Sequence, residues 1–164
     1  MQWRLTQRDR GLPRSSILCH HGINHWLCEE EEMVTGGCLC GGVKFSISGE
    51  LQPLQLCHCA QCRKAQGTAF AAALPIRADA FTLLSGEELL RHFESSPGKE
   101  RAFCGRCGSP IYSRRASRPD ALRIRAGLID QPLPVCPAFH QHVASKANWW
   151  NITDDIKQFP GGPA

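Results

Sequence analysis

The sequence has no apolar run long enough to cross a lipid bilayer. Its longest wholly apolar stretch covers the eight residues 69–76, whereas a membrane-spanning helix needs about 20 residues. It also lacks a strong charge of either sign, because 19 basic and 15 acidic side chains leave a net charge of +4. That charge is too small to indicate a nucleic-acid partner. We therefore expect neither a membrane protein nor a nucleic-acid-binding protein.

Residues 1–33 do not have the pattern expected of a secretory signal peptide. Arg8, Asp9 and Arg10 interrupt the first apolar residues, and histidines at 20, 21 and 25 break the next stretch. No small-residue cleavage site follows, as a signal peptide would require. With 164 residues, the chain can bury a core without the disulfides that the smallest secreted domains need. These absences favour a cytoplasmic protein in a reducing compartment.

Residues 1–33 differ from the rest of the chain. They carry four arginines against five acidic residues and end in four consecutive glutamates before Met33. No helical or strand periodicity is present there. We expect residues 1–33 to be an N-terminal extension, which is either disordered or lies upstream of a true translation start at Met33. Residues 34–160 are expected to form one domain, and residues 161–164 a tail.

The pattern after residue 34 is that of short strands. Apolar and polar side chains alternate over residues 43–48, which predicts a half-buried strand. Residues 81–84 and 89–93 flank the turn pair Ser85-Gly86 and predict a hairpin. Residues 60–66 predict one or two helical turns that end at Gly67. Since 11 prolines and 15 glycines interrupt the chain, we expect an all-β fold of short antiparallel strands with metal-binding loops.

Cysteine is abundant, with ten residues in the chain. Seven of them fall into three closely spaced groups: Cys38 and Cys40; Cys57, Cys59 and Cys62; Cys104 and Cys107. Such short spacings make strained disulfides. They do place thiolates on one tight turn, as a zinc site requires. We therefore predict zinc ligands.

Seven ligands match one closed site of four and one three-ligand site with an open position. The triplet 57–62 is the natural three-ligand site, and the two separated pairs would join distant segments in a closed cage. Two alternatives remain open: one zinc site with three spare thiols, or two structural sites in which His58 is the eighth ligand. Cys19, Cys28 and Cys136 receive no assigned role.

Four segments resemble the motifs of a known family. They are residues 37–43, residues 57–67, residues 103–110 and residues 140–149. The sequence is similar in these segments to the glutathione-dependent formaldehyde-activating enzyme (Gfa) family, also called the centromere protein V family. The resemblance covers about residues 36–160. Asn148 stands where the family usually has proline, which removes no ligand.

The resemblance implies a Mss4-like, or β-tent, fold and carbon–sulfur lyase activity. It implies two zinc ions per chain: a structural one on Cys38, Cys40, Cys104 and Cys107, and a catalytic one on Cys57, Cys59 and Cys62. The implied reaction joins glutathione, as co-substrate, to formaldehyde to give S-hydroxymethylglutathione. The expected partners are therefore a small-molecule thiol and an aldehyde.

Other side chains are candidates for contact with substrate. Arg63 and His140 are predicted to bind it, and basic residues at 64, 114, 115 and 118 could hold glutathione carboxylates. His140 and His142 are expected to share one face of a strand, where a ligand or general-acid role competes with a purely structural one.

Two other functions compete with the enzyme. One is a non-catalytic zinc-stabilised module that docks on a protein, chromatin or cytoskeletal partner. The other is a redox or metal-buffering protein with exposed thiols.

Overall fold

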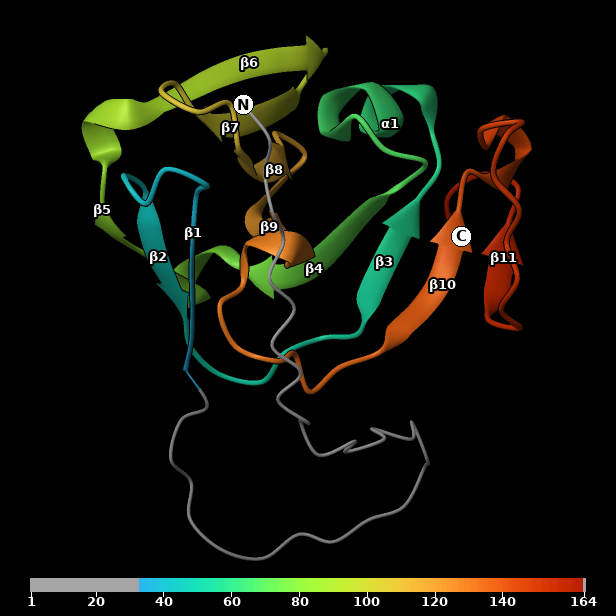
Figure 1. Cartoon of the computed structure of the whole chain (residues 1–164), viewed down its shortest axis with the longest axis horizontal. Helices are drawn as coiled ribbons and strands as arrows, with labels where there is room; N and C mark the ends of the chain where they lie inside the picture. The colour runs from blue at the N-terminus through green and yellow to red at the C-terminus, as the bar shows by residue number, and fades with distance from the viewer. Residues whose placement is uncertain (1–32, 164) are drawn as a thin grey trace, which may run out of the picture.

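The computed structural model describes residues 33–163, so the predicted N-terminal extension, apart from Met33, lies outside the described residues. Strands dominate the chain, which confirms the expected all-β fold (Figure 1). The strands are β1 (Val34–Gly37), β2 (Lys44–Ile47), β3 (Leu54–Cys57), β4 (Ala71–Arg77), β5 (Phe81–Ser85), β6 (Leu90–Ser96), β7 (Lys99–Cys104), β8 (Pro110–Arg115), β9 (Arg118–Arg125), β10 (Pro137–Gln141) and β11 (Lys157–Phe159).

The strands form two sheets. A three-stranded antiparallel sheet has the order β1-β2-β5, and an eight-stranded sheet has the order β11-β10-β3-β4-β9-β8-β7-β6. In the large sheet β10 runs parallel to both β3 and β11, while the other neighbours are antiparallel. The parallel pairing of β10 with β3 places Gln141 opposite Cys57. It therefore brings the C-terminal part of the chain beside the predicted cysteine triplet.

The predicted hairpin around Ser85-Gly86 is wrong. Both segments are strands, but β5 pairs with β2 and β6 pairs with β7. Gly86 has a φ of 85°, and a 3₁₀ turn (Glu87–Leu89) follows it, so the chain leaves one sheet and enters the other. A Cβ at Gly86 would lie 2.3 Å from the Gly42 carbonyl oxygen. The glycine thus permits this close crossing, which a short-range pattern cannot distinguish from a hairpin.

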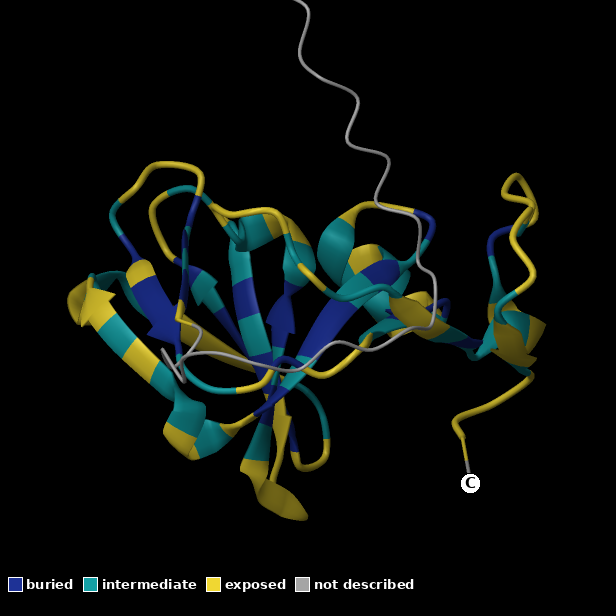
Figure 2. Cartoon of the chain, turned by 90° about the horizontal axis from the view of Figure 1, so that it is seen from below, coloured by how far each residue is buried: buried dark blue, intermediate teal, exposed yellow. Residues whose placement is uncertain are grey.

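The hydrophobic core lies between the two sheets. The small sheet contributes Phe45 and Ile47, and the large sheet contributes Leu74, Ile111 and Ile124, all of them fully or almost fully buried. In Figure 2 the buried residues follow the strands through the middle of the molecule, and the exposed residues lie in loops, at strand ends and along the edge strand β6. The two sheets are therefore held together by one shared core.

The predicted helical turns are confirmed as α1 (Ala60–Gln66), which ends at Gly67 with a φ of 64°. The Gly67 amide donates to the Arg63 carbonyl, closing the last turn in the manner that glycine favours. Among residues 33–163, no helix is both long enough and apolar enough to span a membrane.

Candidate functional site

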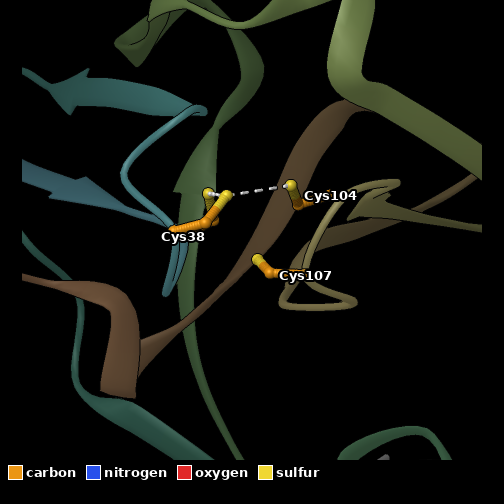
Figure 3. Close-up of side chains that lie close together, drawn as sticks. Cys38, Cys104 and Cys107 are labelled. Atoms are coloured by element: carbon orange, nitrogen blue, oxygen red, sulfur yellow. Dashed lines mark hydrogen bonds between the residues drawn. The ribbon is translucent and has the colours of Figure 1, made fainter.

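Four cysteine sulfurs converge at the ends of the two sheets. Cys38 and Cys40 lie in the turn after β1, Cys104 ends β7, and Cys107 lies in the turn before β8. The four sulfurs lie within 4.8 Å of one another, and Figure 3 shows those of Cys38, Cys104 and Cys107 turned toward a common point. Two sulfur–sulfur distances are 3.5 Å (Cys38 to Cys40) and 3.9 Å (Cys40 to Cys104). A tetrahedral zinc–thiolate site needs about 3.8 Å, so these residues fit a zinc ion.

Local backbone structure holds this four-cysteine cluster in place. The Val43 amide donates to the Cys38 sulfur at 3.2 Å, and Gly41, with a φ of 69°, lets the chain turn back. On the other side, hydrogen bonds with the side chain and the backbone of Ser109 lower the pKa of Cys107 to about 5. The Leu39 amide donates to the Ser109 hydroxyl at 3.0 Å, which ties the two turns together. The cluster is thus closed by chain from both sheets.

A second cluster contains the predicted triplet. Cys57 ends β3, Cys59 caps the N-terminus of α1, and Cys62 lies in its first turn. Their sulfurs also lie within 4.8 Å of one another. The Cys62 amide donates to the Cys59 sulfur at 3.4 Å, so the thiol takes the capping role that serine or aspartate usually fills. The cluster does not include His58, so the alternative with His58 as the eighth ligand finds no support in this geometry.

The pKa values of Cys62 and Cys57 are shifted in opposite directions. Hydrogen bonds with Cys57 and Cys59, together with the Arg101 guanidinium, hold the pKa of Cys62 well below its usual range. The Arg101 Nη2 atom donates to the Cys62 sulfur at 3.8 Å. Hydrogen bonding with Cys59 and Cys62, followed by burial, raises the pKa of Cys57. Cys62 is therefore more acidic than Cys57 and lies next to a positive charge.

A buried chain of hydrogen bonds supports the triplet loop from behind. The His140 Nε2 atom lies 3.0 Å from an Asp154 carboxylate oxygen, and the His140 Nδ1 atom lies 2.7 Å from His58 Nε2. Since a carboxylate accepts, His140 donates through Nε2, and a neutral His140 then accepts at Nδ1 from His58. Burial is the main cause that lowers the pKa of His58, which keeps that ring neutral. His58 is thus fixed between the two triplet residues Cys57 and Cys59.

The structure separates the two histidines expected to share a face. His140 is 2% exposed within β10 and does not line the cavity beside the triplet. His142 follows the strand with a φ of 59° at the start of a 3₁₀ turn (Val143–Ser145), so its side chain lines that cavity. The expectation of a shared face is wrong, because the left-handed residue ends the alternation of the strand.

Arg63 donates from Nε to the His58 carbonyl and from Nη2 to the Ser145 carbonyl, both at 3.2 Å. It therefore joins α1 to the C-terminal segment. The substrate-binding roles of Arg63 and His140 stay predictions.

The triplet opens onto a cavity of about 100 Å³ whose other walls are strongly basic. We call five of its lining residues the basic cluster: Lys99, Arg101, Arg115, Arg123 and Arg125. Sequence reasoning had singled out only Arg115 among them. A signal was present, because Lys99 and Arg101, and likewise Arg123 and Arg125, are separated by two positions and face the same side of a strand. It could not be interpreted without knowing that this side faces the triplet rather than solvent.

The comparisons with known proteins agree with this geometry. The family model described as glutathione-dependent formaldehyde-activating enzyme matches residues 33–145, which include both cysteine clusters and the basic cluster. The chain belongs to this family. A Halomonas elongata relative, provisionally named glutathione-dependent formaldehyde-activating enzyme, is 33% identical over 129 residues, covering 73% of this chain and 81% of the relative.

Structural comparison finds the same fold in a solved structure. A crystal structure of a Rhodobacter sphaeroides protein matches with a TM-score of 0.52 and 24% sequence identity, covering 62% of this chain and 97% of that one. The likeness extends the shared architecture to a second protein. Within this Gfa-family chain, Asp154 lies beyond the segment that the family model matches, so its bond to His140 is an observation of the structure alone.

Replacing His140 tests whether this histidine is structural. His140→Phe leaves the buried His58 Nε2–H without its acceptor, a loss of roughly 1–3 kcal/mol in the free energy of unfolding. Because the His58 loop carries two of the triplet sulfurs, we also expect zinc affinity to fall roughly 10–100-fold. Chemical denaturation and competition with a zinc chelator measure the two effects. Asp154→Asn, which keeps an acceptor oxygen, is the milder control. Unchanged stability with a raised KM for glutathione would instead support the substrate-binding role.

Lys99 is a buried cation without an acidic neighbour in the cavity. Burial, followed by the charges of Arg123, Arg115, Arg101 and Arg125, lowers its pKa from 10.5 to about 8. A lowered lysine pKa means that the charged form destabilises the folded state below pH 8. Lys99→Met is therefore expected to raise the free energy of unfolding at pH 7, by at most about 3 kcal/mol.

The lowered pKa of Lys99 also predicts how the stability of the wild type changes with pH. Between pH 8 and 10.5 the folded wild type has released the Lys99 proton while the unfolded chain still holds it, so wild-type stability rises with pH. The advantage of Lys99→Met should shrink across this window, as denaturation curves at several pH values would show. The exposed residue Lys44 supplies the control Lys44→Met. If the difference in stability between Lys99→Met and the wild type did not depend on pH, the lowered pKa of Lys99 would be contradicted.

Proposed function

We propose that this chain is a zinc-dependent carbon–sulfur lyase that acts on a thiol–aldehyde adduct such as S-hydroxymethylglutathione. The observation that supports it best is the contrast between the two cysteine clusters. Four sulfurs, contributed by turns of both sheets, converge in one cluster, while the three sulfurs of the other cluster line a cavity. Structural zinc sites use four protein ligands, and catalytic sites use three and leave a position for substrate. The names of the family and of the Halomonas relative point to the same chemistry.

In this proposal Cys38, Cys40, Cys104 and Cys107 hold the structural zinc, and Cys57, Cys59 and Cys62 hold the catalytic one. Zinc at the triplet would supply one property, a lowered pKa for a thiol substrate, so that it is a thiolate at neutral pH. The reaction forms a C–S bond between the thiolate sulfur and the carbonyl carbon, and the carbonyl oxygen takes up a proton. The reverse reaction breaks that bond and returns the proton.

The chain's own residues provide orientation and proton exchange. Arg101 contacts the Cys62 sulfur and fixes one wall of the cavity. His142 lines the same cavity, and its imidazole is of the type that exchanges protons near neutral pH. We assign it the proton transfer at the carbonyl oxygen. The His58–His140–Asp154 hydrogen bonds keep the triplet loop in one conformation.

The test is a measurement of exchange between glutathione and formaldehyde. Purified protein should contain two zinc ions per chain by elemental analysis. It should accelerate the formation and breakdown of the adduct, followed by NMR exchange spectroscopy, and protein stripped of zinc should not. Two zinc ions without any acceleration would contradict the lyase and favour the zinc-stabilised docking module.

A further inference from the structure

The basic cluster is built by the register of three neighbouring strands. Arg101 on β7 lies opposite Ser113 on β8, and Ser113 lies opposite Arg123 on β9. One row further along, Lys99 lies directly opposite Arg115. Like charges opposite each other across two strands destabilise a sheet. The fold therefore retains an arrangement that costs stability.

The charges of this cluster are not balanced within the cavity. No aspartate or glutamate lines it among the described residues. Lys99, Arg101 and Arg125 are each less than 10% exposed, so water cannot fully solvate them. Two of their buried nitrogens, Arg101 Nη1 and Arg125 Nε, have no hydrogen-bond partner within the described chain. Buried charges are normally paired, and arginine cannot escape the cost by releasing its proton.

The partners that these side chains do have are neutral, apart from one thiol. The Arg101 Nε atom donates to the Ser95 hydroxyl at 2.9 Å, and the Arg123 Nε atom donates to the Gln55 side-chain oxygen at 3.3 Å. Among the hydrogen-bond partners of the basic cluster within residues 33–163, only the Cys62 sulfur, 3.8 Å from Arg101, can carry negative charge. Three thiolates on a divalent ion would carry a single negative charge, which cannot offset five cations.

We propose that the basic cluster is an anion subsite that binds a carboxylate of the reacting molecules next to the triplet. This inference rests on the proposed function and specifies its substrate class: the adduct is anionic, and its carboxylate accepts hydrogen bonds from Arg125 and Arg101. Guanidinium groups bind carboxylates through charge-assisted hydrogen bonds. Alanines at 71 and 73 form the neighbouring wall of the cavity, and their short side chains leave space in front of Arg125.

The size of the cavity limits where this carboxylate can lie. Its volume of about 100 Å³ corresponds to roughly three water molecules. The volume of the cavity is smaller than that of a tripeptide, so part of a bound glutathione molecule would lie outside it. The carboxylate therefore belongs either to the thiol, folded back beside its sulfur, or to the carbonyl compound itself. The two sources share one chemistry and are separated by experiment.

Binding to the zinc-loaded full chain tests the subsite without relying on turnover. Isothermal titration compares glutathione with its dimethyl ester, in which both carboxylates are blocked, and separately measures glyoxylate, an aldehyde that carries a carboxylate. We expect glutathione or glyoxylate to bind, with Arg125→Gln reducing the affinity about tenfold or more and leaving the ester unaffected. Arg77 is an exposed arginine that pairs with Asp79 outside the cavity, so Arg77→Gln should bind these ligands with wild-type affinity.

The two titrations, one with glutathione and its ester and one with glyoxylate, identify which molecule supplies the carboxylate. Loss of binding on esterification assigns it to the thiol. Arginine-dependent binding of glyoxylate assigns it to the carbonyl compound, and exchange of glyoxylate with the uncharged thiol 2-mercaptoethanol should then exceed that of formaldehyde. If Arg125→Gln fails to fold, Arg115→Gln at the exposed edge of the same cavity takes its place.

The outcomes distinguish this inference from the proposed function. Equal affinity for glutathione and its ester, together with no effect of Arg125→Gln on glyoxylate, overturns the subsite even if formaldehyde exchange is catalysed. Carboxylate-dependent binding that is lost in Arg125→Gln supports the subsite even if no exchange is accelerated, in which case the lyase assignment fails alone.

Discussion

A chain carrying Cys104→Ser is expected to lose its folded structure at ordinary temperatures. Cys104 is fully buried and packs in the core that the two sheets share. Its sulfur completes the four-cysteine cluster between the turn after β1 and the end of β7. Structural zinc contributes on the order of 10 kcal/mol of apparent folding free energy. A small domain has a total stability of about 5–15 kcal/mol, so loss of the site removes most of it.

Zinc content, thermal unfolding and the yield of soluble protein measure this effect. Cys62→Ser is the matched control, because it replaces the same side chain in the other cluster and leaves the connection between the sheets intact. Cys62→Ser should lose one zinc and remain folded. A folded Cys104→Ser chain with the wild-type melting temperature would contradict a structural role for the four cysteines.

Cys62→Ser itself carries the second large prediction, a loss of glutathione–formaldehyde exchange by at least about a thousandfold. Losses of this order follow the removal of a catalytic group in other enzymes. Cys62 is half-buried in the first turn of α1 and carries the lowered pKa of the triplet. A serine hydroxyl stays protonated at neutral pH and cannot replace a thiolate ligand.

NMR exchange rates measured on the folded variant, with its zinc content determined in the same sample, provide the test. Ser113→Ala, at the wall of the same cavity, controls for a small change of surface without loss of a ligand. Retention of wild-type exchange by Cys62→Ser would remove the triplet from the mechanism. Loss of exchange with both zinc ions retained would assign Cys62 to a role other than ligation.

The parts of the site that sequence predicted correctly are local. The helix at residues 60–66 and its end at Gly67 follow from short-range patterns, as do the short spacings within each of the three cysteine groups. The predicted hairpin around Gly86 is wrong because β5 pairs with the distant strand β2, while β6 pairs with β7, the strand that follows it. The sequence also did not predict that Arg125 lies near the triplet. That position depends on the register of β9 against β4 and of β4 against β3, the strand that ends at Cys57.

His142 is a single residue whose side-chain direction could not be predicted from the local sequence. Alternation along a strand predicts that the His142 side chain lies on the same face as that of His140. Its left-handed φ of 59° instead places the residue at the cavity. Non-glycine residues rarely adopt this conformation, and here the His142 amide donates to the Gly161 carbonyl, a tertiary contact. Neither fact is visible in the local sequence.

The two cysteine clusters differ in how far apart their ligands lie along the chain, and this sets an order of assembly. Cys59 and Cys62 are three residues apart, whereas Cys40 and Cys104 are separated by 64. Closing a short loop costs little entropy, so a nascent chain can offer the triplet to a metal ion before any sheet exists. The four-cysteine cluster forms only when both sheets have docked. A metal bound there would therefore report completed folding, whereas a metal at the triplet could bind before the cavity is formed around it.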